Sequence, residues 1–325
     1  MHVIAFAEPK ALYTFSDQTI RLEIIYEASM LWLNKSLTTL RDEVFILYAH
    51  QPNEHRHCLY DINVYNGYNL KELKETIPLP VTEVRFMAGC NVSNCVYVCV
   101  ETGASFEIVR IAKDEEHKFK VSPWKTDFGW SIDLMTVSAN GNLIIFSRYG
   151  PSSFGNSSFP KGPYSIHVFS ADGTLQYQAM LSPDIIRECL YVNQKSNGNV
   201  VLAYAGVRKC HIRLQELDFS GGVLTVVREF KSSFRVPSRE CCVSLADDND
   251  RMIIAHSFEG IELLDSEFNL IGVYHLPNTC NYDERSDLLD LIYDSNRHEI
   301  VRTRCDSRDG IGGNSVFTIF RFTED

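Results

Sequence analysis

The chain has few of the features that mark zinc-binding, secreted or membrane proteins. No Cys-x-x-Cys pair occurs among its 10 cysteines, which argues against a structural zinc site. No apolar run approaches the roughly 18 residues that a membrane span needs. The first residues contain neither the basic region nor the long apolar stretch of a secretory signal. We therefore expect a cytoplasmic protein that does not bind membranes.

The motifs of several common enzyme classes are missing as well. There is no Gly-x-Ser-x-Gly elbow for nucleophilic catalysis. Neither a Gly-x-Gly-x-x-Gly sequence nor a phosphate loop is found. Acidic side chains outnumber basic ones by 42 to 31, for a net charge of −11, which disfavours nucleic acid as a partner. These absences predict no cofactor and identify no catalytic residue.

A repeated pattern of short apolar strands is what the sequence does have. Its plainest copy spans residues 241–274, where four strands are separated by three polar turns. This arrangement is typical of an antiparallel meander. Upstream copies carry Asn140-Gly141, Asp172-Gly173 and Asn197-Gly198 between their strands. Asn-Gly and Asp-Gly are strong hairpin signals because the turn residues must accept positive φ.

Counting the first strands gives six repeats, about 40 to 56 residues apart, which is the spacing of propeller blades. We predict an all-β fold, a six-bladed β-propeller of four-stranded antiparallel blades. The last repeat offers only three strands, so residues 20–26 or 2–6 are expected to pair with it and close the ring. The prediction is a single domain over 1–325, with an N-terminal segment 1–35 that includes the closing strand and blades over 36–323.

The repeats resemble those of a known family. The sequence of residues 263–271, an apolar strand followed by an acidic turn, is similar to NHL-type propeller repeats. Residues 94–98 and 138–143 fall where that family has its second-strand hairpins. The strand periodicity is also WD40-like, although no Trp-Asp dipeptide occurs. NHL propellers form the C-terminal domain of many tripartite-motif proteins, so the resemblance implies a recognition platform.

Aromatic and arginine side chains in loops suggest where such a platform would bind. Loops on a rigid scaffold usually carry recognition, and these residue types are enriched in binding hot spots. Our main hypothesis is a non-enzymatic scaffold that binds a protein or peptide partner through one loop face. The candidate residues are Trp124, Phe128, Trp130, Arg148, Tyr149, Phe154, Phe234, Arg235 and Arg239. Alternatively, Trp124, Phe128 and Trp130 pack between blades, or the surface binds RNA, as in some NHL propellers.

Acidic residues at the starts of the first strands suggest an enzyme as a further alternative. First strands line the central channel of a propeller, so Glu83, Asp133, Glu188 and Glu240 would share one mouth of it. Such a ring would serve a calcium-dependent, lactonase-like hydrolase. Arginines stand beside several of these acids, however, and would compete for the carboxylates. The competing interpretation is therefore an ion-pair belt between blades.

Overall fold

The computed structural model consists of β-strands in the parts of the chain that it describes. These are residues 3–6, 12–14, 20–31, 34–49, 60–67, 72–81, 83–102, 105–128, 130–149, 163–181, 186–206, 211–220, 224–235, 241–245, 248–256, 260–275, 286–294, 299–306 and 314–324. Within these ranges no helix has the length and apolar character to cross a membrane.

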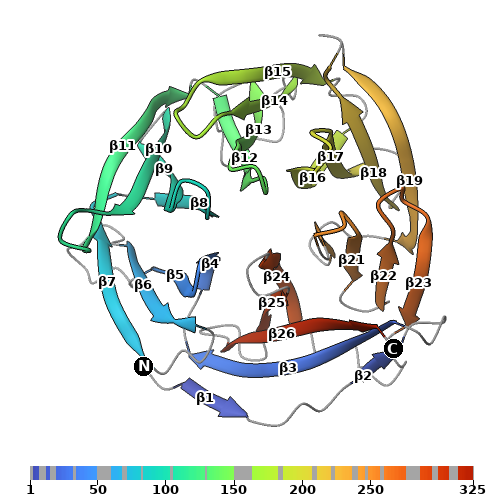
Figure 1. Cartoon of the computed structure of the whole chain (residues 1–325), viewed down its shortest axis with the longest axis horizontal. Helices are drawn as coiled ribbons and strands as arrows, with labels where there is room; N and C mark the ends of the chain where they lie inside the picture. Colours follow the sequence, from blue (N-terminus) through green and yellow to red (C-terminus); the bar gives the residue numbers. More distant parts are fainter. Residues whose placement is uncertain are drawn as a thin grey trace. The chain divides into compact units, whose positions relative to one another are not determined.

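Five sheets have four antiparallel strands each, in chain order (Figure 1). The first contains β4 (Asn34–Leu40), β5 (Glu43–Ala49), β6 (Tyr60–Asn66) and β7 (Leu73–Leu79). The second contains β8 (Glu83–Cys90), β9 (Cys95–Thr102), β10 (Ser105–Lys113) and β11 (Phe119–Phe128). The third contains β12 (Trp130–Val137), β13 (Leu143–Tyr149), β14 (Tyr164–Phe169) and β15 (Leu175–Leu181).

The fourth and fifth sheets repeat this form. The fourth contains β16 (Ile186–Gln194), β17 (Val200–Gly206), β18 (His211–Asp218) and β19 (Thr225–Arg235). The fifth contains β20 (Cys241–Leu245), β21 (Met252–His256), β22 (Gly260–Leu264) and β23 (Leu270–His275). Sheets of four sequential antiparallel strands are the blades of a β-propeller. The prediction of an all-β propeller with four-stranded antiparallel blades is therefore confirmed.

The predicted count of six four-stranded blades is wrong, because the remaining sheet has six strands. It contains β24 (Ser286–Asp294), β25 (Glu299–Asp306), β26 (Asn314–Glu324), β3 (Ile20–Leu31), β1 (Val3–Phe6) and β2 (Leu12–Thr14). As expected, an N-terminal strand joins the last repeat: β3 pairs with β26 from Leu31 opposite Asn314 to Ile20 opposite Glu324. Both β1 and β2 then pair with the other edge of β3.

The contacts of the chain divide it into two compact units. One consists of Lys35–Leu202 and Leu217–Thr225, and the other of Met1–Asn34, Ala203–Glu216 and Val226–Asp325. The sheet of β16 to β19 includes residues of both. That the chain forms a single domain stays a prediction.

Burial changes regularly from strand to strand within a blade. All of Cys95–Val100 in the second strand β9 is buried, as is all of Met252–His256 in the second strand β21. The sequence of a strand covered on both faces is a continuous apolar run, without the alternation of apolar and polar residues that a half-exposed strand has. The fourth strands are more exposed, and in β15 no side chain is buried.

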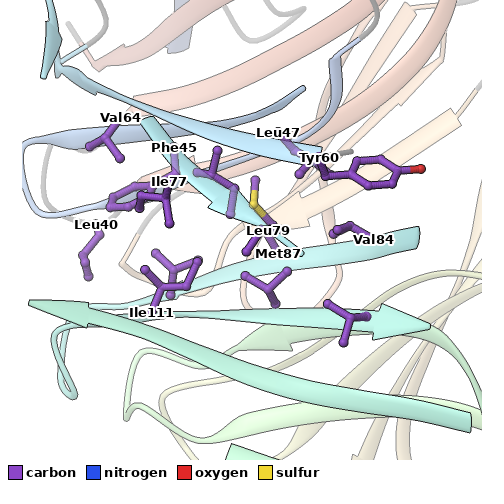
Figure 2. Packing of buried hydrophobic residues seen from close by; sticks show 14 residues of the cluster. Leu40, Phe45, Leu47, Tyr60, Val64, Ile77, Leu79, Val84, Met87 and Ile111 are labelled. Atoms are coloured by element: carbon purple, nitrogen blue, oxygen red, sulfur yellow. The ribbon is translucent and has the colours of Figure 1, made fainter. Parts of the chain in front are cut away.

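A layer of apolar side chains joins the first two blades. Figure 2 shows Phe45 and Leu47 of β5, with Ile77 and Leu79 of β7, directed toward Met87 of β8. Val98 and Ile111 belong to the same cluster. A second cluster, which includes Cys90, Tyr97, Ile132 and Phe169, joins the second blade to the third. Blade packing therefore supplies the core of this unit.

The predicted Asn-Gly and Asp-Gly turns are confirmed, but their geometry is different. Only the glycine of each pair has positive φ, with values of 81° at Gly141, 88° at Gly173 and 90° at Gly198. The Gly141 N–H donates to the Ser138 carbonyl at 2.9 Å, and the other two turns have the same bond. This is the three-residue hairpin loop, a type I turn followed by one left-handed residue.

Candidate functional site

Three of the described first strands carry a β-bulge near their start, and the extra residue in β24 is Leu289. In β8 the register shifts between Val84 and Phe86, so Arg85 is the extra residue. In β12 it shifts between Ile132 and Leu134, so Asp133 is the extra residue. A bulge redirects the side chain of the inserted residue and is common beside active sites. The extra residues in β8 and β12 are charged, which makes them the first candidates for a functional site.

Asp133 forms an ion pair with Arg148 of the neighbouring strand β13. The Asp133 Oδ1 atom lies 3.6 Å from Arg148 Nη2, and the two side chains are 27% and 34% exposed. That distance is longer than the roughly 2.8 Å of a direct charge-assisted hydrogen bond. Both side chains of the pair are therefore partly accessible to solvent.

A buried tyrosine lies beside this pair. Tyr164 of β14 is directly opposite Arg148 in the sheet and is 2% exposed. Burial raises the pKa of Tyr164, while the charge of Arg148 and its hydrogen bond oppose that rise. The guanidinium thus interacts with both a neutral phenol and a carboxylate.

Arg85 is held by two carboxylates of its own sheet. Its Nε donates to Glu101 Oε2 at 2.9 Å, and its Nη1 lies 3.5 Å from Glu83 Oε1. The Glu101 side chain is 13% exposed and that of Glu83 is 36% exposed. Glu83, the first acid of the predicted channel ring, is therefore paired with arginine, as is Asp133.

The described acids do not fit a divalent cation. Calcium takes six to eight oxygen ligands, yet Glu83 and Asp133 are each paired with a guanidinium. Among the residues that the structure describes, no group of three His, Cys, Asp or Glu side chains could hold a metal ion. The side chains of Glu188 and Glu240 lie outside the described residues.

Of the residues predicted to bind a partner, Trp124 and Arg148 have described side chains. Trp124 lies in strand β11, so the prediction of a loop over 124–130 is wrong. Its ring packs edge-on against Tyr97 at 5.0 Å and Phe169 at 6.0 Å between ring centroids. Trp124 is thus a partly buried wedge between the second and third blades, which was the alternative interpretation.

The other candidates cannot be placed in a site. Phe128, Trp130, Tyr149, Phe234 and Arg235 lie in strands, but their side chains are outside the described residues. Phe154 and Arg239 are outside them entirely. The binding role given to these seven residues stays untested.

A shallow cavity of about 450 Å³ lies over the outer strand β15. Its lining includes Tyr177, Met180, Phe219 and Leu224 and contains no charged side chain. Tyr177 is its one titratable group. The cavity thus offers no carboxylate to accept a proton and no cation to stabilise a negative charge, so the Asp133–Arg148 pair is the better candidate for chemistry.

Comparison with known proteins supports the fold and no closer relationship. No protein-family model matches the chain, and neither does any curated protein sequence. The NHL resemblance therefore has no support. Similar solved structures include a PQQ-bound aldose sugar dehydrogenase from Streptomyces coelicolor, at 10% identity and a TM-score of 0.56, covering 97% of this chain and 100% of that one.

Two further neighbours have similar statistics. A gluconolactonase from Xanthomonas campestris is 11% identical, with a TM-score of 0.51, and the match covers 97% of this chain and 99% of that one. A luciferin-regenerating enzyme is 10% identical, with a TM-score of 0.52 and coverages of 96% and 95%. At these identities the likeness shows the fold alone.

The neighbours nevertheless contradict the prediction of a non-enzymatic scaffold. The proteins named above are enzymes, and the resemblance that implied a recognition platform is unsupported. The prediction of a non-enzymatic scaffold is therefore withdrawn. The sequence did indicate Asp133, as an acid at the start of a first strand, and Arg148, as a candidate for partner binding, but neither their pairing nor the bulge that redirects the Asp133 side chain.

Proposed function

We propose that this chain is a hydrolase for small cyclic esters, in which Asp133 and Arg148 are the reacting side chains. The observation that carries the proposal is the placement of Asp133 on a bulge of β12, 3.6 Å from the partly exposed guanidinium of Arg148. The gluconolactonase among the structural neighbours supports the choice of substrate class.

Each charge of the pair has a place in ester hydrolysis. The Asp133 carboxylate accepts a proton from a water molecule, and the hydroxide adds to the carbonyl carbon of the ester. The Arg148 guanidinium stabilises the negative oxygen that forms there. When the ring C–O bond breaks, the leaving alkoxide takes the proton back from Asp133, and the product is an open hydroxy acid.

The surroundings of Arg148 support this assignment. Tyr164 is buried, lies directly opposite Arg148 in the sheet and hydrogen-bonds with its side chain, which limits the directions in which Arg148 can point. A positioned donor contributes more than a mobile one because little reorganisation is needed during the reaction.

Acid release from a panel of lactones, including gluconolactone, tests the proposal in a pH-stat. We expect Asp133→Asn to lower kcat by at least about 100-fold, the usual contribution of a general base. Asp172→Asn is the matched control, since Asp172 is an exposed acid in a turn of the same sheet. Its rate should equal that of the wild type.

Two results would overturn the proposal. One is a wild-type protein that accelerates no lactone in the panel. The other is an Asp133→Asn variant that keeps the wild-type rate. Sugar-dependent dye reduction with added PQQ, in the absence of lactone hydrolysis, would instead favour a dehydrogenase like the first structural neighbour.

A further inference from the structure

Two cysteines face each other at the end of a hairpin in the second blade. Cys90 is the last residue of β8, Cys95 is the first residue of β9, and the two are directly opposite in the register. Neither has measurable exposure. Side chains at directly opposed positions leave the sheet on the same face, with Cβ atoms about 4.5 to 5.5 Å apart. A disulfide needs about 3.5 to 4.5 Å between them, so a small closing movement suffices.

The two sulfurs are not equivalent. The Ser93 N–H donates to Cys90 Sγ at 3.3 Å. The Cys90 thiol itself contacts the Ser93 hydroxyl at 3.3 Å and the Gly141 carbonyl at 3.7 Å. The hydrogen bond with Cys95, followed by those from Ser93, lowers the pKa of Cys90, whereas the same shared bond and burial raise the pKa of Cys95. Cys90 is therefore the first of the two to ionise.

Arg110 supplies an independent sign that this cluster accepts negative charge. Its Nη2 donates to the Ser93 carbonyl at 3.1 Å. Its Nε is buried and has no hydrogen-bond partner. A hydrogen bond with Cys95 raises the pKa of Arg110, which places the guanidinium beside that sulfur. A buried donor without a partner is costly, and a thiolate or an oxidised sulfur beside it would reduce the cost.

Cys99 provides an internal comparison. It lies on the same strand as Cys95 and is equally buried. Its register partners are Phe86 and Ile108, so no second sulfur is opposite. Burial raises the pKa of Cys99 to about 12. Burial alone therefore does not produce the properties of the Cys90 and Cys95 pair.

We propose that Cys90 and Cys95 form a peroxide-reactive dithiol that closes to a disulfide across the β8–β9 hairpin. The Cys90 thiolate attacks one oxygen of hydrogen peroxide, the O–O bond breaks, and Cys90 becomes a sulfenic acid while the released hydroxide takes up a proton. The Cys95 sulfur then attacks Cys90 Sγ, and the S–O bond breaks. The departing hydroxide takes the Cys95 proton and leaves as water. Two thiols lose two electrons in total, and one peroxide becomes two waters.

The position of the hairpin is compatible with access by a small oxidant. Val92, in the turn between the two cysteines, is 64% exposed. The sulfurs thus lie directly beneath a surface turn. Hydrogen peroxide is about the size of two water molecules, so a movement of this turn away from Gly141, which it contacts, would admit it to the sulfurs.

Mass spectrometry of the full-length protein after treatment with hydrogen peroxide tests this inference. We expect loss of two thiols, with an internal disulfide mapped to Cys90 and Cys95 and reversed by dithiothreitol. Cys95→Ser should stop the reaction at a sulfenic acid on Cys90, which a dimedone probe would trap. Cys99→Ser is the matched control and should form the same disulfide as the wild type.

The variant Arg110→Gln tests whether the guanidinium contributes to the reaction beyond the proximity of the two sulfurs. Closure of the Cys90 sulfenic acid by Cys95 should be about tenfold slower in this variant, because Arg110 lowers the pKa of Cys95 and one pKa unit changes the thiolate fraction tenfold for a thiol that titrates well above neutral pH. The inference is overturned if Cys90 and Cys95 stay reduced in the wild type while other cysteines oxidise. It is also overturned if Cys99 takes part in the disulfide. Both results come from wild-type protein, so they do not depend on the folding of a variant.

Discussion

At the scale of single residues, Gly89 shows how closely neighbouring blades approach. A Cβ atom built at Gly89 would lie 1.9 Å from the Thr39 carbonyl oxygen, and the Gly89 N–H donates to Thr38 Oγ1 at 2.8 Å. The backbone of β8 therefore lies directly against that of β4. No side chain fits between them.

Gly89→Ala should therefore destabilise the protein by about 2 to 3 kcal/mol, because two backbones must separate to admit a methyl group. Urea unfolding followed by fluorescence measures the loss. Gly198→Ala is the control, since its Cβ has space and only its φ of 90° is unfavourable. That variant should lose about 1 kcal/mol. Equal losses in the two variants would contradict the steric explanation.

His167 predicts a dependence of stability on pH. It is 7% exposed, and its Nε2 lies 3.1 Å from Ser147 Oγ. Burial, with a smaller effect of Lys125, lowers the pKa of His167 to about 4. The unfolded chain, with a histidine pKa near 6.5, then binds more protons between pH 6.5 and 4. Stability should fall as the pH decreases through this range, by up to about 3 kcal/mol.

Comparison of His167→Gln with the wild type isolates this contribution from those of the other histidines. The unfolding free energy of both proteins is measured by urea denaturation from pH 7 to pH 4. The variant should show a smaller decrease than the wild type. Parallel curves would show that His167 titrates alike in the folded and unfolded chains.

The sequence predicted some of these residue-scale features and not others. The turn glycines were predictable because Asn-Gly and Asp-Gly are local signals. The conformation of Phe268 was not predictable. Its φ of 66° is left-handed, and it occupies the same position in the turn of residues 265–269 that glycine occupies in the other turns. Its side chain is 5% exposed, so tertiary packing holds a conformation that its residue type disfavours. The bulge at Asp133 likewise depends on pairing with β13, which no local pattern encodes.

At the scale of elements, a buried carboxylate joins two blades. Glu262 of β22 is fully buried and accepts a hydrogen bond from Ser232 Oγ of β19 at 2.6 Å. The N–H and the hydroxyl of Ser233 donate to its other oxygen, at 2.9 Å and 2.5 Å. Three donors from one outer strand thus satisfy an acid of the next blade.

Ser232→Ala should destabilise the protein by about 1 to 3 kcal/mol, because a buried carboxylate loses a donor that water does not replace. Ser220→Ala is the control: Ser220 is exposed and bonds to Asp218 in a surface turn. Thermal unfolding of both variants measures the difference. The interpretation fails if the two melting temperatures are equal.

The sequence predicted strands well where every side chain of the strand is buried. It predicted the outer strands of the blades less well. The apolar run of residues 95–100 is typical of a strand, and the structure shows all six residues buried. Residues 124–130, rich in aromatics and polar groups, resembled an exposed loop. They extend β11 and begin β12 instead, because Trp124 gains more from packing on Tyr97 and Phe169 than from exposure.

At the scale of the whole molecule, one sheet is built from both ends of the chain. β26 is paired with β25 on one side and with β3 on the other. The sequence predicted this pairing from a last repeat with too few strands. It did not predict that β1 and β2 would extend the sheet to six strands, because these short segments carry no repeat signal of their own.

Removal of residues 1–31 should expose one edge of β26 and lower the melting temperature by several degrees. Size-exclusion chromatography should also detect association of the truncated protein, since an unpaired strand edge is a site for pairing between chains. A synthetic peptide of residues 20–31 should restore the melting temperature, and a scrambled peptide should not. Unchanged stability of the truncated protein would show that β3 adds nothing to this sheet.

The pairing of β3 with β26 also has a consequence for biosynthesis. The partner of residues 20–31, residues 314–324, is translated nearly 300 residues later. At about 5 to 20 residues per second, the early strand waits roughly 15 to 60 s for its partner. In the nascent polypeptide, residues 20–31 must therefore remain unpaired, or be protected by a chaperone, until residues 314–324 have been translated.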